Sequence, residues 1–148
     1  MDIREILDRH EQETQRYFGI ALSNVNPHVL TDIKNQLLQY LSPTELWFVP
    51  GEDQAPQVPV SRIQFCIEVF GKPHPDGLIV FMPEQWMFNW TKSDRAVFWA
   101  QLAETYGQNR IYVVFGETPS IVQFASAYLT RVTTAAQQVS VWTSKRER

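Results

Sequence analysis

Cysteine, histidine and glycine are all scarce in this 148-residue chain, and each shortage argues against a class of protein. The single cysteine, Cys66, excludes an internal disulfide and therefore a disulfide-stapled scaffold. The three histidines, His10, His28 and His74, lie too far apart to give the ligand spacing of a metal site. The glycines are isolated and form neither GxGxxG nor GxxxxGK[ST], the common phosphate-binding loops. We therefore expect no metal and no other cofactor.

Long apolar runs are also missing. No stretch approaches the roughly 18 apolar residues that a membrane span needs, and the N-terminal MDIREILDRHEQE has no apolar signal-peptide core. Together with the lone cysteine, these absences favour a soluble, cytoplasmic protein that does not bind membranes. A hydrophobic fraction of 44% is typical of a globular chain. We expect one globular domain over residues 1–148, with a proline-rich flexible loop at about 50–61 and a short basic tail at 144–148.

Hydrophobic periodicity divides the chain into helices and strands. Apolar residues recur at helical spacing in four segments, and shorter apolar runs bounded by proline, glycine or asparagine indicate strands. Residues 62–70 alternate apolar and polar side chains, which predicts a strand with one covered face. The expected helices span about 3–21, 28–41, 91–106 and 119–142, and the expected strands span about 46–49, 62–70, 78–82 and 111–115.

The order of these segments predicts an α/β or α+β fold with a mixed four-stranded sheet. The first two helices are joined by a short connection, which favours an N-terminal helical hairpin. Strands 78–82 and 111–115 are apolar throughout, as buried parallel strands are, and with helix 91–106 they form one βαβ unit. A long C-terminal helix completes the expected fold.

The loops that follow strands 78–82 and 111–115 contain most of the candidate site. If the two strands are parallel, both loops leave from the carboxyl edge of the sheet, where open α/β folds bind their ligands. The residues expected to share this crevice are polar or aromatic, namely Glu84, Trp86, Phe88, Trp90, Glu117, Thr118 and Ser120.

The aromatic members of this set allow two interpretations. Trp86, Phe88 and Trp90 alternate along the chain, so an extended segment would direct all three rings to one side. The rings then either pack beneath the crevice as part of the core, or form an exposed apolar surface for a partner.

The last expected helix carries an apolar stripe with heptad spacing. This stripe suits a helix that lies across the sheet, and it is also compatible with a homodimer formed through the 121–142 helix. Alanine and tyrosine are weak residues for a dimer seam, which favours packing against the sheet. The stripe consists of Ile121, Ala125, Tyr128, Val132, Ala135, Val139 and Trp142.

Positive charge is concentrated in the last third of the chain. From residue 91 onward there are seven basic and four acidic residues, whereas the whole chain has a net charge of −3. A solvated basic end is the simpler interpretation, and contact with the phosphates of a nucleic acid is the alternative. The residues that would then contact phosphate are Arg131, Lys145, Arg146 and Arg148.

No constellation of residues in the sequence indicates catalysis. The abundance of tryptophan, tyrosine and arginine instead favours a protein-binding or regulatory module, such as an adaptor, an inhibitor or a chaperone-like protein. Its partner is expected to be another protein, bound through the aromatic crevice or the last helix. Two alternatives stay open, namely a nucleic-acid-associated protein and a small enzyme of unknown reaction that uses Glu84, Glu117 and Ser120.

Overall fold

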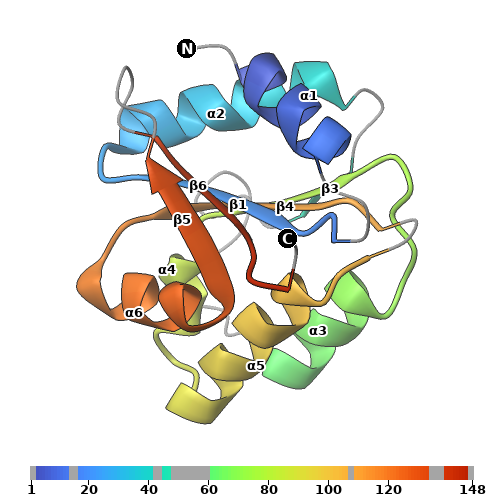
Figure 1. Ribbon diagram of the computed structural model, residues 1–148. Coiled ribbons are helices and arrows are strands. Elements are labelled where there is room, and N and C mark those ends of the chain that lie inside the picture. The colour runs from blue at the N-terminus through green and yellow to red at the C-terminus, as the bar shows by residue number, and fades with distance from the viewer. Residues whose placement is uncertain are drawn as a thin grey trace.

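The computed structural model describes residues 3–13, 17–41, 45–47, 61–106, 109–133 and 139–146, which form helices around a mixed β-sheet (Figure 1). The helices are α1 (Ile3–Glu13), α2 (Pro27–Tyr40), α3 (Arg62–Phe70), α4 (Glu84–Met87), α5 (Lys92–Ala103) and α6 (Pro119–Tyr128). The strands are β1 (Ile20–Asn24), β2 (Glu45–Trp47), β3 (Leu78–Phe81), β4 (Ile111–Gly116), β5 (Leu129–Thr133) and β6 (Ser140–Ser144).

The six strands are ordered β2-β3-β4-β1-β6-β5 in one sheet. The first four strands in this order are parallel to one another, because β2 pairs parallel with β3, β3 with β4, and β4 with β1. The remaining two pairings, β1 with β6 and β6 with β5, are antiparallel. The predicted parallel pairing of the βαβ unit is therefore confirmed, with Leu78 opposite Ile111 and Phe81 opposite Val114.

Helices cover both faces of the sheet and create two apolar layers. Helices α1 and α2 lie on one face, and α3, α5 and α6 lie on the other (Figure 1). Alternate residues of each buried strand serve the two layers, so that Val113 packs toward α5 while Val114 packs toward α2. The strands are buried on both sides, which explains why β3 and β4 consist of continuous apolar runs.

Several predicted elements are confirmed, and so is the α/β class. Helices α2 and α5 and strands β3 and β4 lie within a few residues of the predicted ranges. Threonine caps the start of α5 and of α6, because Thr91 accepts a hydrogen bond from the Asp94 N–H at 3.1 Å and Thr118 accepts one from the Ile121 N–H at 3.4 Å. These hydroxyls satisfy donors that the first turn of a helix would otherwise leave free.

The prediction that residues 62–70 form a strand is wrong, because they form α3. Ser61 caps this helix, and its hydroxyl accepts a hydrogen bond from the Gln64 N–H at 3.2 Å. The buried side chains Phe65, Cys66 and Val69 follow helical spacing, whereas Ile63, part of the apparent alternation, is 62% exposed. Over nine residues the alternating pattern and the helical pattern overlap, and the alternating one was misleading.

The predicted first helix is too long. Helix α1 ends at Glu13, and residues 20–24 form β1 at the centre of the sheet, so the two N-terminal helices are not a simple hairpin. They do lie on the same face, where Tyr40 donates a hydrogen bond to Asp8 at 3.0 Å. Gly19 precedes β1, and a Cβ atom there would lie 2.3 Å from the carbonyl oxygen of Leu102. Only glycine therefore allows the chain to approach α5 so closely before β1 begins.

The prediction of one long C-terminal helix is also wrong. Helix α6 ends at Tyr128, and the chain continues as β5 and, after residues outside the described part, as β6. Trp142 is fully buried on β6, and its indole N–H donates a hydrogen bond to Ser23 of β1 at 2.8 Å. The heptad stripe is thus divided between a helix and a sheet, and the expected 121–142 helix that could join two subunits does not exist.

Among the described residues the sheet accordingly has six strands, whereas four were predicted. The strand predicted at 46–49 corresponds to β2, with residues 48 and 49 outside the described part of the chain. The predicted loop at 50–61 lies outside it except for Ser61, and so does the end of the predicted basic tail, residues 147–148. That the chain forms one domain stays a prediction, although all of the described strands belong to one sheet.

Candidate functional site

The carboxyl ends of β1, β3 and β4 lie at one edge of the sheet, as their parallel pairing requires. The chain leaves β1 toward α2 on one face and leaves β4 toward α6 on the other face. Asn24 and Gly116, the last residues of the two strands, are partners in the register. Such a divergence of neighbouring connections is the place where open α/β sheets form ligand-binding crevices.

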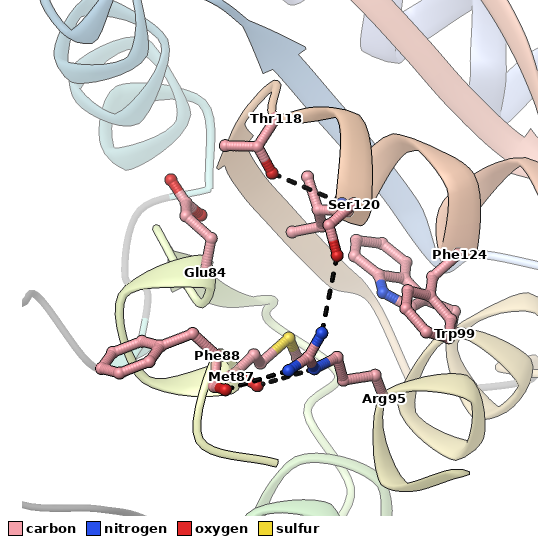
Figure 2. Close-up of a pocket in the computed structure, with 9 residues that line it drawn as sticks. Glu84, Met87, Phe88, Arg95, Trp99, Thr118, Ser120 and Phe124 are labelled. Carbon is pink, nitrogen blue, oxygen red and sulfur yellow. Dashed lines mark hydrogen bonds between the residues drawn. The ribbon is translucent and has the colours of Figure 1, made fainter. Parts of the chain in front are cut away.

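A pocket of about 190 Å³ opens beside this edge, between α4, α5 and α6 (Figure 2). Most of its wall is apolar, and a few polar groups are directed into it. The residues that line it are Glu84, Met87, Phe88, Arg95, Trp99, Thr118, Ser120, Ile121 and Phe124. Figure 2 shows α4 and Phe88 on one side of this space and the start of α6 on the other.

Helix α4 forms the outer wall of the pocket and is only four residues long. It follows directly from β3, where Met82 adopts a φ of 55° and still donates its N–H to the Val114 carbonyl at 2.7 Å. Positive φ is uncommon for a residue with a side chain, and it redirects the chain sharply at the end of the strand. The buried ring of Pro83 and the side chain of Met87 then hold α4 against the body of the protein.

Glu84 connects α4 to the end of β4. Its Oε2 atom accepts a hydrogen bond from the Gly116 N–H at 2.8 Å, while its Oε1 atom is buried with no hydrogen-bond partner in the described part of the chain. Burial raises the pKa of Glu84 to about 7, although hydrogen bonds from the N–H groups of Glu84 and Gly116 lower it. The carboxyl group is therefore largely neutral below pH 7.

Arg95 lies on the opposite side of the pocket, on the first turns of α5. Its Nε atom donates to the Met87 carbonyl at 3.0 Å and its Nη2 atom donates to the Phe88 carbonyl at 2.9 Å. Its Nη1 atom is 3.5 Å from the Ser120 hydroxyl, and the guanidinium carbon lies 5.9 Å from the centre of the Phe124 ring. Arg95 thus joins the C-terminal end of α4 to α6 across the pocket (Figure 2).

Four of the seven predicted binding residues line this pocket. Glu84, Phe88, Thr118 and Ser120 come together there, and Phe88 is 65% exposed at the rim. The expectation that residues 86–90 form one extended stretch is wrong, because Glu84–Met87 is helical. Trp86 belongs to α4, and its side chain is not among those that the structure describes.

Trp90 and Glu117, the other two described candidates, lie away from the pocket lining. Trp90 is 7% exposed and packs edge-on against Phe65, with ring centres 5.4 Å apart, so it belongs to the core. The carboxylate of Glu117 forms an ion pair with Arg131 of β5. Each of the two interpretations therefore holds for one described ring, because Trp90 lies in the core and Phe88 lies at the surface.

Sequence reasoning missed five residues of the pocket. Arg95 and Trp99 lie within the predicted helix 91–106 and were not predicted to belong to the site. Met87, Ile121 and Phe124 were not assigned to the site at all. The usable signal was the spacing of Arg95 and Trp99, because residues four apart lie on one face of a helix.

Two of the four residues of the nucleic-acid alternative, Arg131 and Arg146, are engaged within the protein. Arg131 pairs with Glu117, donates to the Ser140 hydroxyl at 2.9 Å and lies over the Trp142 ring. Arg146 pairs with Glu104 at 2.8 Å. Lys145 is exposed, and Arg148 lies outside the described residues. The ion pairs of Arg131 and Arg146 argue against their use in phosphate binding.

Over the residues that the structure describes, no group of three or more histidine, cysteine, aspartate or glutamate side chains is placed to hold a metal ion. Burial raises the pKa of the Cys66 thiol to about 11, which keeps it protonated. None of the helices in the same residues is long and apolar enough to cross a membrane.

We compared the chain with protein-family models, with curated proteins and with solved structures, and none of the three comparisons gave a significant match. The interpretation of the pocket therefore depends on its own geometry.

Proposed function

We propose that this protein is a non-catalytic binding module whose pocket between α4, α5 and α6 receives an apolar side chain of a partner protein. The observation that carries the proposal is Phe88, a large ring that is 65% exposed at the rim of a largely apolar pocket. Exposed aromatic rings beside a cavity are the groups that commonly anchor protein partners. The strand-end position of the pocket supports the same conclusion.

The size of the pocket favours a single side chain over a large cofactor. Its volume of about 190 Å³ is below the range of about 300–1,000 Å³ that small-molecule pockets usually have. Burying one large apolar side chain contributes about 2–3 kcal/mol. That contribution gives weak binding by itself, so the partner is expected to add contacts along the neighbouring surface of α4 and α6.

The chemistry of the lining supports a non-catalytic role. Of the nine residues that line the pocket, none is a histidine, cysteine or lysine. Ser120, the best-placed hydroxyl, lies beside the guanidinium of Arg95, which cannot accept a proton from it. A serine nucleophile needs an adjacent base. Glu84 is bonded to the main chain of Gly116 rather than to a second acid.

Filling the pocket tests this proposal. Ser120 is exposed on the first turn of α6, so Ser120→Phe places a ring in the pocket without removing a core contact. Ser126→Phe adds the same ring on an exposed position of the same helix, outside the lining, and is the matched control. We expect peptides selected on the unmodified protein from a phage-displayed random 12-residue library to lose at least tenfold in affinity for Ser120→Phe only.

The proposal fails if no clones are enriched on the unmodified protein over the Ser120→Phe variant. It also fails if both serine variants weaken binding equally, because the effect would then not come from the pocket. Circular dichroism and urea unfolding establish that both variants are folded before the affinities are compared.

A further inference from the structure

We infer that the side chain bound in this pocket is flanked by a carboxylate, which Arg95 and Ser120 hold, so that the partner presents an acidic residue beside an apolar anchor. This inference rests on the proposed function and identifies the chemistry of the segment that the pocket accepts. It follows from the bonding of Arg95, the electrostatic surroundings of the pocket and the orientation of Glu84.

The main-chain bonds of Arg95 fix its guanidinium and leave donors unused. The Met87 and Phe88 carbonyls accept from Nε and Nη2, which orients the planar group. A guanidinium has five N–H donors, and the 3.5 Å separation from Ser120 is at the long limit of a hydrogen bond. The remaining donors lie at the pocket, beside a hydroxyl that can also donate to a carboxylate.

Arg95 differs from five other cations that form ion pairs in the described part of the chain. Arg62, Lys72, Arg110, Arg131 and Arg146 each pair with a carboxylate of the chain. Arg95 instead contacts carbonyl and hydroxyl oxygens, and no carboxylate of the described part of the chain neutralises it.

The apolar wall strengthens the attraction of this cation for an anion. The Phe124 ring lies beside the guanidinium, and Met87 and Phe88 line the same pocket, so one side of this partly exposed cation faces apolar side chains. Charge-assisted hydrogen bonds are about twice as strong as neutral ones, and an arginine can hold a carboxylate through two parallel bonds. A carboxylate beside the anchoring side chain would complete the bonding of Arg95.

Glu84, the acidic residue of the pocket, does not oppose this arrangement. Its carboxyl group is turned away from Arg95 and toward the end of β4, where Gly116 donates to it (Figure 2). The charged side chains on the elements around it have other contacts, since Lys34 of α2 lies over the Phe81 ring and Glu117 pairs with Arg131. Asp32 of α2 is exposed. Arg95 therefore determines the sign of charge that the pocket prefers.

The test uses the phage-displayed random 12-residue library on three proteins, namely the unmodified chain, Arg95→Gln and Lys92→Gln. Lys92→Gln removes the same charge from an exposed position of the same helix, outside the pocket lining, and serves as the control. We expect aspartate or glutamate to be enriched next to an aromatic or large aliphatic residue on the unmodified protein and on Lys92→Gln, but not on Arg95→Gln.

A synthetic pair measures the effect directly. One enriched peptide, blocked at both ends, is compared with its counterpart in which glutamine replaces the acidic residue. On the unmodified protein the acidic peptide should bind about three- to tenfold more tightly, as expected for a charge-assisted bond at a partly exposed site. On Arg95→Gln the acidic peptide and its glutamine counterpart should bind with equal affinity. Arg95→Lys keeps the charge without the planar fork and provides a second variant if Arg95→Gln is unstable.

The possible failures are distinguishable. Enrichment of apolar anchors without acidic neighbours, or equal affinity of the two peptides on the unmodified protein, overturns the inference while the proposed function stands. The absence of clones enriched over Ser120→Phe overturns both. If free 3-phenylpropanoate binds more tightly than the acidic peptide, the occupant is a small acid rather than a protein segment, and the inference is wrong.

Discussion

Replacing Glu84 by glutamine should change how the stability of this protein depends on pH. The carboxyl group has a pKa of about 7 in the folded protein, against an ordinary value of 4.5, because it is buried beside Gly116. The folded state therefore binds this proton more tightly than the unfolded state. The stabilising effect of protonation is fully present below pH 4.5, declines as the pH rises, and is lost above about pH 7.

The magnitude follows from the shift in pKa. Each pKa unit corresponds to about 1.4 kcal/mol, so a rise from 4.5 to about 7 corresponds to at most about 3 kcal/mol between the two ends of this range. Partial exposure of the side chain reduces this value. We expect a loss of about 1–3 kcal/mol of unfolding free energy between pH 5 and pH 8.5 that the Glu84→Gln variant does not show.

Urea unfolding at pH 5, 7 and 8.5 measures the difference. Glutamine cannot ionise and keeps an oxygen that can accept from the Gly116 N–H. The unfolding free energy of the variant should therefore increase relative to that of the unmodified protein as the pH rises. Asp76→Asn removes one exposed carboxylate and is the control for the general effect of charge. A stability difference between Glu84→Gln and the unmodified protein that stays constant from pH 5 to pH 8.5 would refute the reasoning.

Three further substitutions test the description of the site. Phe88→Ala should change the unfolding free energy by no more than about 0.5 kcal/mol, because the ring is 65% exposed, whereas Trp90→Ala in the core should cost about 3–5 kcal/mol. Equal losses of stability in urea unfolding would contradict this division of the aromatic segment. Gly116→Ala should destabilise the protein by about 1–3 kcal/mol, because the new Cβ would lie 2.8 Å from Glu84 Oε2, displace the carboxyl group and leave the Gly116 N–H without its acceptor. It should also reduce the dependence of stability on pH, and an unchanged dependence would show that the displacement does not occur.

The part of the fold that the sequence predicted correctly has signals that agree with one another. Strands β3 and β4 are apolar throughout, and Thr91 and Thr118 are hydroxyl residues placed where a helix begins. Local propensity, capping and burial point to the same structure at these positions, so the prediction is reliable. The parallel pairing of β3 and β4 then places the two loops of the site at the same edge of the sheet.

The errors arise where two periodicities fit the same residues. Ile63, Phe65, Ile67 and Val69 alternate in sequence, yet tertiary packing selects the helical set that buries Phe65, Cys66 and Val69. The change from α6 to β5 occurs at Leu129 without the glycine or proline that commonly ends a helix. The β-branched Val132 and Thr133 were the available warning, since such residues favour strands.

The site was predicted only in the part that depends on strand ends. Glu84, Phe88, Thr118 and Ser120 lie in or next to the loops that follow β3 and β4, so topology alone brings them together. The wall formed by Trp99 and Phe124 depends on how closely α5 and α6 approach each other. Such distances arise from packing of the whole core, and no local pattern in the sequence contains them.

The position of helix α4 links the charges of Glu84 and Arg95 to the shape of the pocket. A four-residue helix has almost no stability of its own, because forming the first turn costs more than it returns. Its position is therefore set by tertiary contacts. Besides the buried Pro83 and Met87 side chains, these are the bond from Gly116 to Glu84 at the first end and the bonds from Arg95 to the Met87 and Phe88 carbonyls at the second end. Ionisation of Glu84 leaves a charge with one unpartnered oxygen at the first end. A carboxylate bound to the remaining N–H groups of Arg95 would further restrict the guanidinium at the second end. The protonation of Glu84 and the binding of a carboxylate by Arg95 would therefore both act on the same wall of the pocket.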